Sequence, residues 1–192
     1  MEKLILIGGG GHCKSCIDVI EQENKYEIAG VLDIPEKIGT EILGYKIIGT
    51  DDDIEKFVKQ GFYFLITVGH IKTVEPRLRI YQKLKDMNAK LATVVSPRAY
   101  ISKHAKIGEG SIIMNDAIIN AGANVAENCI INNKAILEHD CQICKHSHVS
   151  TSTVINGEVI VGEKSFIGSN ATVVQCVTIP PKSFVKAGSL VK

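Results

Sequence analysis

The chain has no marked excess of either charge and no long hydrophobic run. Its 192 residues include 22 Lys and Arg against 21 Asp and Glu, a formal net charge of +1. This balance argues against nucleic acid or an anionic membrane as a partner, because both attract strongly basic proteins. No apolar run approaches the length of a bilayer span, and the first residues lack the extended apolar core of a signal peptide. We therefore expect a globular protein of the cytoplasm.

The six cysteines lack the spacing of a zinc ribbon. Two pairs have the C-x-x-C spacing, Cys13 with Cys16 and Cys141 with Cys144, but they lie in different halves of the chain. Such pairs can bind zinc or act in redox chemistry. In a reducing compartment, however, cysteines stay free thiols. We expect six free thiols and no metal site.

What the sequence does contain is a six-residue repeat over its C-terminal half. Every sixth residue from Val95 to Val191 is Ile, Val or Leu, and the fourth residue after each of the first sixteen is small or β-branched. A period of six is neither helical nor the alternation of a half-buried strand. It is typical of a chain wound into a triangular prism, with one hexapeptide on each face. The repeat predicts a parallel β-helix over residues 94–192, with Cys129 and Cys141 among its small inward residues.

Residues 1–93 show a different pattern, in which strands alternate with helices. Buried strands are expected at Lys3–Ile7, Glu27–Leu32 and Phe62–Val68. Helices are expected over residues 12–22, 51–58 and 75–87, the second of them capped by Thr50. This order predicts an α/β domain, a small Rossmann-like βαβαβ unit with at most four or five parallel strands.

Four glycines separate the first expected strand from the first helix. A glycine loop lets a ligand approach the backbone, and the helix N-terminus offers free N–H groups to a phosphate. Gly8-x-Gly10 matches the start of the dinucleotide fingerprint, but Cys13 stands at its third glycine position. Asp33 ends the second strand, where an acidic group often contacts a ribose. A nucleotide-linked ligand is favoured over a plain glycine turn, and the domain is too small for a complete NAD site.

The repeats contain one group of residues suited to proton transfer. Glu138-His139-Asp140 is followed closely by His146 and His148, and none of the five occupies the inward aliphatic position. A carboxylate beside an imidazole can fix its tautomer and stabilise the imidazolium, as a general base requires. Two alternatives remain open at this point. The side chains can simply face solvent, or His146 and His148 can bind a metal.

A glycine follows one coil later. The backbone N–H of Gly157 can serve as an oxyanion donor for a bound acyl group, or Asn156-Gly157 can be an ordinary turn.

The two halves together resemble the bacterial nucleotide-sugar acetyltransferases with a left-handed β-helix. Five segments carry the resemblance: residues 8–12, the strand end at Asp33, residues 68–70, residues 136–140 and residues 147–150. The chain is similar to the acetyl-CoA-dependent enzymes of bacillosamine and perosamine synthesis, which N-acetylate the 4-amino group of a nucleotide-linked 4-amino-4,6-dideoxy sugar. Sialic-acid O-acetyltransferases are related to them.

The resemblance implies a role for particular residues. His139 matches the general base, and Asp140 replaces a Glu that pairs with it. His148 matches a residue near the cysteamine end of acetyl-CoA, and the N–H of Gly157 matches a contact to the acetyl carbonyl. Residues matching those around the nucleotide-sugar are Gly8, Gly10, Gly11, His12, Asp33, Gly69 and His70. His70 stands where the family commonly has Asn.

The resemblance also implies direct acetyl transfer without a metal, in a homotrimer with acetyl-CoA between subunits. Domain 1–93 is then expected to bind the nucleotide-sugar, and domain 94–192 to bind acetyl-CoA and catalyse the transfer. Two other functions stay open: an O-acetyltransferase acting on sialic acid or a related nonulosonic acid, and a non-catalytic scaffold or nucleotide sensor. The acidic residue after His139 favours the N-acetyltransferase. The sequence leaves the carrier open among UDP, dTDP, GDP and CMP.

Overall fold

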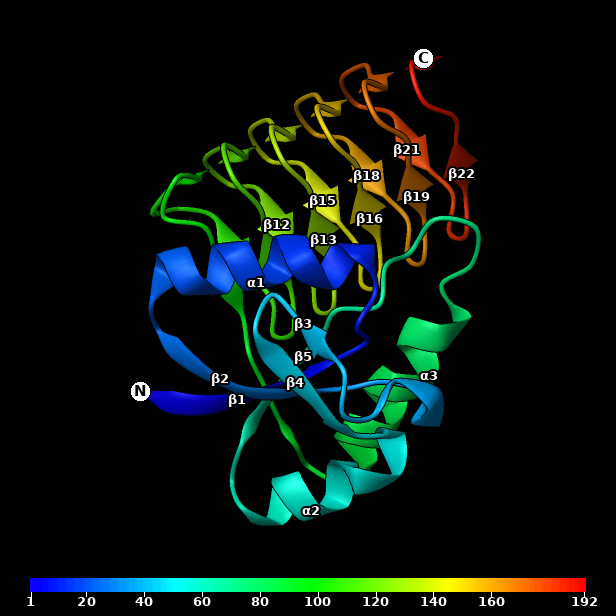
Figure 1. The fold of residues 1–192 in the computed structure, drawn as a ribbon. Coiled ribbons are helices and arrows are strands. Elements are labelled where there is room, and N and C mark those ends of the chain that lie inside the picture. The colour runs from blue at the N-terminus through cyan, green and yellow to red at the C-terminus, as the bar shows by residue number, and fades with distance from the viewer. The chain divides into compact units, whose positions relative to one another are not determined.

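The computed structural model describes all 192 residues, which divide into two compact units (Figure 1). The first unit comprises Met1–Gly69 and Thr73–Ala92, and the second comprises His70–Lys72 and Thr93–Lys192. None of the helices is long and apolar enough to cross a membrane.

The first unit is built on a six-stranded sheet with the order β3-β4-β2-β1-β5-β6. The strands are β1 (Glu2–Ile7), β2 (Tyr26–Leu32), β3 (Glu41–Ile42), β4 (Tyr45–Gly49), β5 (Tyr63–Ile66) and β6 (Lys90–Leu91). Five of them run parallel, as predicted. The sequence pattern did not predict β4 or the antiparallel strand β3, which forms a hairpin with β4.

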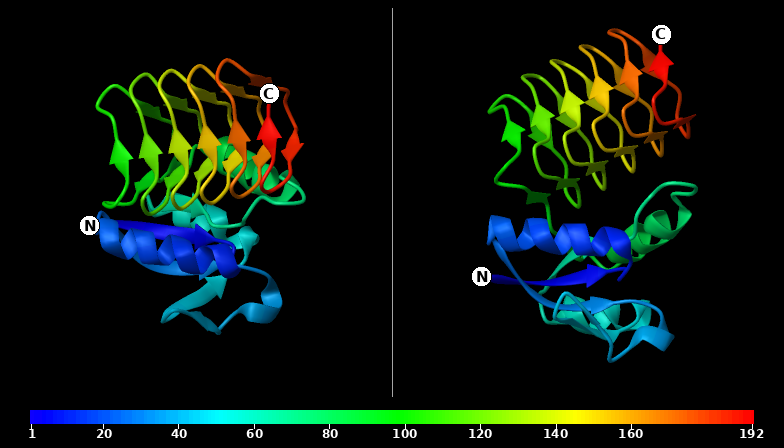
Figure 2. Two further views of the ribbon diagram at one scale, coloured as in Figure 1. Left: turned by 90° about the horizontal axis from the view of Figure 1, so that it is seen from above. Right: turned by 45° about the horizontal axis from the view of Figure 1, so that its top comes forward.

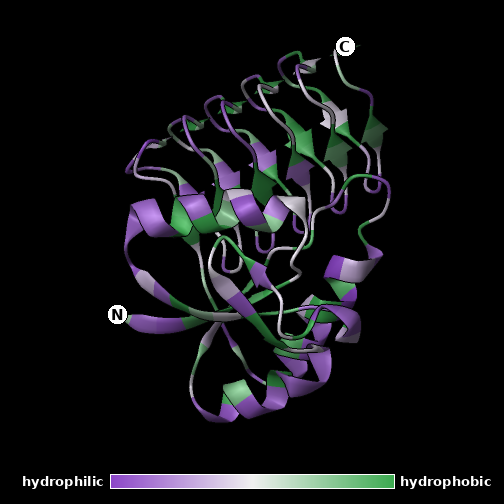
Figure 3. Ribbon diagram, in the orientation of Figure 1, coloured by the Kyte–Doolittle hydropathy of each residue, from purple (hydrophilic) through white to green (hydrophobic).

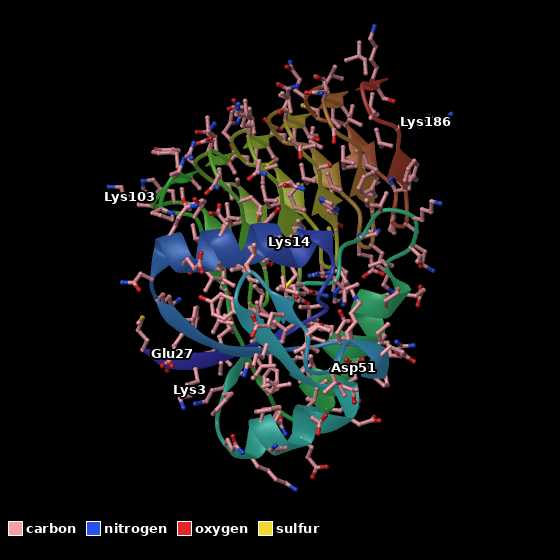
Figure 4. All side chains as sticks on the ribbon, in the orientation of Figure 1. Lys3, Lys14, Glu27, Asp51, Lys103 and Lys186 are labelled. Carbon is pink, nitrogen blue, oxygen red and sulfur yellow. The ribbon has the colours of Figure 1, made fainter.

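The three predicted helices are present in the first unit. They are α1 (Gly11–Glu23), α2 (Ile54–Lys59) and α3 (Glu75–Asp86), with short 3-10 turns η1 (Pro35–Lys37) and η2 (Asp51–Asp53). Thr50 forms the expected cap at η2, because its side chain accepts a hydrogen bond from the backbone of Asp52 while the Asp53 side chain bonds back to Thr50. Figure 3 shows hydrophobic and hydrophilic residues alternating along α1, which buries Cys13 and Cys16 on its apolar side.

The second unit is the left-handed parallel β-helix that the repeat predicts, and Figure 2 shows its coils stacked along one axis. Each strand has two residues. They are β7 (Val94–Val95), β8 (Tyr100–Ile101), β9 (Lys106–Ile107), β10 (Ile112–Ile113), β11 (Ile118–Ile119), β12 (Asn124–Val125), β13 (Ile130–Ile131), β14 (Ile136–Leu137), β15 (Gln142–Ile143), β16 (His148–Val149), β17 (Val154–Ile155), β18 (Ile160–Val161), β19 (Phe166–Ile167), β20 (Thr172–Val173), β21 (Thr178–Ile179), β22 (Phe184–Val185) and β23 (Leu190–Val191).

The strands form three parallel sheets, here called the β7, β8 and β9 faces after their first strands. Residues one coil apart pair directly, for example Ile112 with Ile130 and Ile118 with Ile136. The second residue of every strand points inward, and these aliphatic side chains form one continuous core from Val95 to Val191. Cys129 and Cys141 are fully buried in this core, as predicted.

A serine column runs inside one edge of the β-helix. Ser111, Ser147 and Ser165 each donate their hydroxyl to a carbonyl of the following corner, at 2.8, 3.0 and 3.2 Å. Cys129 takes the corresponding position between Ser111 and Ser147, and its thiol donates to the carbonyl of Cys144 at 3.3 Å. Packing and this hydrogen bond explain why a buried cysteine is placed here.

The corners of the prism have a periodicity of their own. From Gly110 to Gly188, the residue three positions after each inward aliphatic residue has a positive φ. Side chains other than glycine rarely adopt this conformation, and Asn and Asp do so most readily. At the corner between the β8 and β9 faces, here called the β8–β9 corner, these residues are Gly122, Asp140, Glu158 and Cys176.

Candidate functional site

The first candidate site lies at the carboxyl ends of β1, β2 and β5 in the first unit. A cavity of about 290 Å³ opens there, lined by residues 7–8, 32–35, 50–52, 68, 76 and 79–80. The chain crosses from β1 to β2 on one side and returns to β5 on the other. Such a reversal of strand order is where open α/β sheets bind their ligands.

The four glycines of the loop have two different causes. A side chain on Gly8 would overlap Val68, and one on Gly9 would come within 2.6 Å of the Asp33 carboxylate. Gly8 also has a φ of 105°, which other residues rarely adopt, so packing and backbone conformation explain these two glycines. Side chains on Gly10 and Gly11 would meet nothing within 4 Å. Gly10 caps α1 without a side-chain hydrogen bond. The first N–H groups of the helix thus have no capping side chain, as a phosphate site requires.

Asp33 closes the glycine loop. Its carboxylate accepts hydrogen bonds from the backbone of Gly9 at 2.8 Å and Ile34 at 2.7 Å, and from the Lys37 side chain at 2.8 Å. Partial burial raises the pKa of Asp33, but these hydrogen bonds outweigh it and hold the pKa below its ordinary value. Asp33 is therefore a fixed negative charge at the cavity wall.

His12 is the second residue of α1 and lies beside Gly69, whose added Cβ would stand 3.8 Å from the His12 Cβ. Burial, together with the nearby Arg77 guanidinium, lowers the pKa of His12 to about 4. Its Nε2 is buried and has no hydrogen-bond partner. Arg77 itself donates to the carbonyls of Ile66 and Val68, at 2.7 Å each. His12 is consequently neutral at physiological pH and offers a hydrogen bond rather than a charge.

The second candidate site lies at the β8–β9 corner of the β-helix. His139 Nδ1 and Asp140 Oδ2 are 3.0 Å apart. The two side chains are 60% and 63% exposed. An ionised carboxylate only accepts hydrogen bonds, so Nδ1 carries the proton and Nε2 presents its lone pair. The structure therefore joins the two residues in the arrangement that a general base requires.

Gly157 lies one coil above His139. A Cβ on Gly157 would stand 2.6 Å from both Cε1 and Nε2 of the imidazole, so only glycine leaves the ring its place. A cavity of about 320 Å³ opens beside the pair. It is lined by Glu138, His139, Asn156, Gly157, Glu158, Gln175 and Cys176. The backbone of Gly157 and the imidazole of His139 thus border one cavity.

Glu138 also lines this cavity, and its contact with Asn120 was not predicted from the sequence. Its Oε2 accepts a hydrogen bond from Asn120 Nδ2 at 2.8 Å. Asn120 stands one coil earlier, at the same corner position. The repeat could have predicted this contact. One coil is three hexapeptides, so residues separated by three hexapeptides, such as Asn120 and Glu138, lie next to each other in adjacent coils.

His148 is placed differently from the rest of the predicted site. It is buried on the β7 face, where its Nδ1–H donates to the carbonyl of His70 at 2.5 Å and its Nε2 accepts from Asn132 at 3.3 Å. Its ring contacts Phe166 edge-on, with centroids 5.1 Å apart, and His70 contacts the same phenyl ring. His148 and His70 therefore share an aromatic cluster, and neither lines the cavity beside His139.

The last candidate from the sequence is a metal site at His146 and His148. His146 is buried, and its Nδ1 is 3.0 Å from the Asn128 carboxamide. No group of three or more His, Cys, Asp or Glu side chains is arranged to hold a metal ion. All six cysteines are free thiols, and burial raises the pKa of Cys141 to about 12.

Comparison with known proteins bears on both units. Residues 3–84 match the family model of the PglD N-terminal domain. This part of the chain is similar to the PglD N-terminal domain. It contains the glycine loop, Asp33 and the cavity at the strand ends. No curated protein sequence matches the chain significantly.

Solved structures extend the similarity beyond residues 3–84. PerB from Caulobacter crescentus, in complex with CoA and GDP-perosamine, is 28% identical with a TM-score of 0.92, over 100% of this chain and 89% of that one. The acetyltransferase domain of PglB from Neisseria gonorrhoeae is 29% identical with a TM-score of 0.92, over 100% and 92%. A second structure of that domain, in complex with acetyl coenzyme A, is 26% identical with a TM-score of 0.89, over 99% and 92%.

These similarities cover residues 3–84 and the β-helix together. They confirm the predicted resemblance to the nucleotide-sugar acetyltransferases with a left-handed β-helix.

Proposed function

We propose that this chain transfers the acetyl group of acetyl-CoA to the 4-amino group of a nucleotide-linked 4-amino-4,6-dideoxy sugar. The observation that carries the proposal is the His139–Asp140 pair at the wall of an open cavity, with Gly157 against the imidazole. Solved structures similar to this chain contain CoA with GDP-perosamine, or acetyl coenzyme A. Their sequences are more than a quarter identical to it along nearly its whole length.

In this mechanism His139 removes a proton from the sugar amine. The amine nitrogen attacks the thioester carbonyl while Nε2 takes the proton, and Asp140 stabilises the imidazolium that forms. The Gly157 N–H donates to the developing oxyanion. The tetrahedral intermediate then collapses, the carbon–sulfur bond breaks and the CoA thiolate leaves. It takes up the proton that His139 holds, so atoms and charges balance without a covalent acyl-enzyme or a metal.

The first unit supplies the proposed binding site for the nucleotide-sugar. Gly10 and Gly11 leave open space at the start of α1, where free backbone N–H groups favour a phosphate. Asp33 keeps one lone pair, on Oδ1, for a ribose or sugar hydroxyl beyond the three hydrogen bonds it accepts. His12 contributes as a neutral group. His70 and His148, which lie in the aromatic cluster of the β7 face, keep in this proposal the roles that the resemblance implies, His70 near the nucleotide-sugar and His148 near acetyl-CoA.

A homotrimer is the proposed assembly, with the β8 face as the subunit contact. The outward residues of this face are mostly apolar: Tyr100, Ile118, Ile136, Val154, Thr172 and Leu190. Those of the β9 face are mostly polar: Lys106, Asn124, Gln142, Ile160 and Thr178. A row of apolar side chains on one face of a prism is suited to burial against a second copy. His139 follows the β8 face directly, so a neighbouring subunit would complete its cavity.

A thiol-release assay tests the activity. Acetyl-CoA is offered with 4-amino nucleotide-sugars on UDP, dTDP, GDP and CMP, and with sialic acids as the opposing set. We expect free CoA only with the amino sugars, and a loss of about a hundredfold or more in kcat for H139A, the size of general-base contributions. H104A is the matched control, because His104 is an exposed histidine at the same corner two coils earlier. Release with sialic acids alone would instead identify an O-acetyltransferase, and no release with any acceptor would favour a non-catalytic scaffold.

A further inference from the structure

We infer that Gly122 is a positioning residue for the His139–Asp140 pair. Because Gly122 has no side chain, the Asp140 carboxylate has room to lie beside the His139 imidazole. The catalytic consequence of this inference rests on the proposed function, but the geometric part does not.

Gly122 lies one coil before Asp140 in the same column of the β8–β9 corner. A Cβ on Gly122 would overlap Asp140 Oδ1 and stand 3.1 Å from its Cγ. The other carboxylate oxygen, Oδ2, is the one that accepts from His139 Nδ1 at 3.0 Å. The carboxylate therefore lies between the glycine on one side and the imidazole on the other.

The backbone of this turn does not itself explain the glycine. Gly122 has a φ of +77°, but Asp140, Glu158 and Cys176 follow in the same column with φ values of 59°, 59° and 61°. This corner thus accepts side chains in the left-handed conformation at three coils in succession. The Asp140 carboxylate, which lies against Gly122, is a separate reason for a glycine at this position.

An alanine at this position would displace Asp140 rather than unfold the coil. The overlapping atom is the end of an exposed side chain, which can rotate into solvent at little cost. Rotation would remove the acceptor from His139 Nδ1. The ring would then no longer be held in the tautomer that presents Nε2 as a base, and the imidazolium would lose its partner.

The experiment compares G122A with G188A. Gly188 has the same turn conformation, with a φ of 69°, and its added Cβ would meet nothing within 4 Å, so G188A carries the backbone cost alone. Imidazole 15N NMR reports which ring nitrogen holds the proton, and the His139 signals are those missing from the H139N spectrum. We expect wild type and G188A to show protonated Nδ1, and G122A to show a mixture of tautomers.

Kinetics give the second measurement. We expect kcat of G122A to fall about ten- to a hundredfold with the KM values little changed, and that of G188A to stay within about twofold. In a D140N background, G122A should cost nothing further, because its effect acts through that carboxylate.

A G122A spectrum with His139 still protonated at Nδ1 would overturn the inference, as would equal losses in G122A and G188A. An inactive wild type would overturn the proposed function instead. The NMR comparison needs no substrate, so it would still decide the role of Gly122.

Discussion

The His139 imidazole occupies the space that a side chain on Gly157 would need. The two residues are one coil apart, and a Cβ on Gly157 would stand 2.6 Å from Cε1 and Nε2. A residue that the sequence indicates only as a turn or an oxyanion donor thus has a steric role as well. The glycine keeps the ring at the wall of the cavity.

We expect G157A to lower kcat about a hundredfold with little change in stability. The new methyl group would push the imidazole away, while Gly157 has no left-handed backbone that alanine would strain. Unlike G122A, this change moves the ring and leaves the Asp140 carboxylate its space. Steady-state kinetics with acetyl-CoA, together with thermal unfolding, measure both effects. Unchanged kcat would exclude the proposed position of the reacting groups.

Cys176 should be the one cysteine that reacts rapidly with an alkylating reagent. It is exposed and lines the cavity beside His139, whereas Cys13, Cys16, Cys129 and Cys141 are buried. Burial also raises the pKa of the half-buried Cys144 thiol, and Glu163 raises it further. Mass spectrometry after brief iodoacetamide treatment should locate one label, absent from C176S. Acetyl-CoA should slow the labelling several-fold, and a rate unaffected by acetyl-CoA would place its binding elsewhere.

Stability should decrease as the pH falls from about 6.5 to 4, because of His12. In this window the unfolded chain binds a proton that the folded chain does not take up until its pKa of about 4. The free energy of unfolding should fall by up to about 3 kcal/mol in this window. Urea unfolding at pH 7.5 and 4.5 measures the fall, and it should be smaller in H12Q. The exposed His104 supplies the control H104Q, which should behave as wild type. Equal pH dependence in H12Q and wild type would mean that His12 is not buried as a neutral group.

C129S should leave stability within about 1 kcal/mol of wild type. Ser111, Ser147 and Ser165 occupy the same position in other coils and donate to carbonyls as the Cys129 thiol does. L137A, by contrast, should cost about 2–5 kcal/mol, because it opens a cavity in the core of the β-helix. Denaturant unfolding compares the two. A large loss in C129S would show that the column requires sulfur rather than a hydroxyl.

I136K should separate the subunits of the proposed trimer. It places a charge in the middle of the apolar row on the β8 face, where a second copy would have to bury it. Q142K makes the matched change on the polar β9 face. Sedimentation should show a monomer for I136K and a trimer for wild type and Q142K. A trimeric I136K would move the contact to another face.

The six-residue repeat alone determined the β-helix and the residues that point into it. One inward aliphatic residue in each hexapeptide is a local rule that every coil repeats, so each coil specifies the same geometry as its neighbours. The alternation of strands and helices likewise predicted α1, α2, α3 and the parallel strands β1, β2 and β5. The β3–β4 hairpin was missed, because β3 has only two residues and no recognisable period.

Only the tertiary structure decided how the residues of the candidate site face one another. His139 and Asp140 are neighbours in sequence, so their pairing could be predicted. The contacts of Gly157 with His139, Gly122 with Asp140 and Asn120 with Glu138 join residues one coil apart. They depend on the register of the coils and on side-chain rotamers, which a repeat does not specify.

The contact of His148 with the His70 carbonyl could not be predicted from the sequence. His70 lies 78 residues earlier in the chain. No local pattern encodes that contact, because the segment of His70 comes from between two elements of the other unit. The sequence specified the β-helix through a rule that each coil satisfies locally. The structure decided which of its histidines borders a cavity and which is buried, because burial depends on every segment that packs nearby.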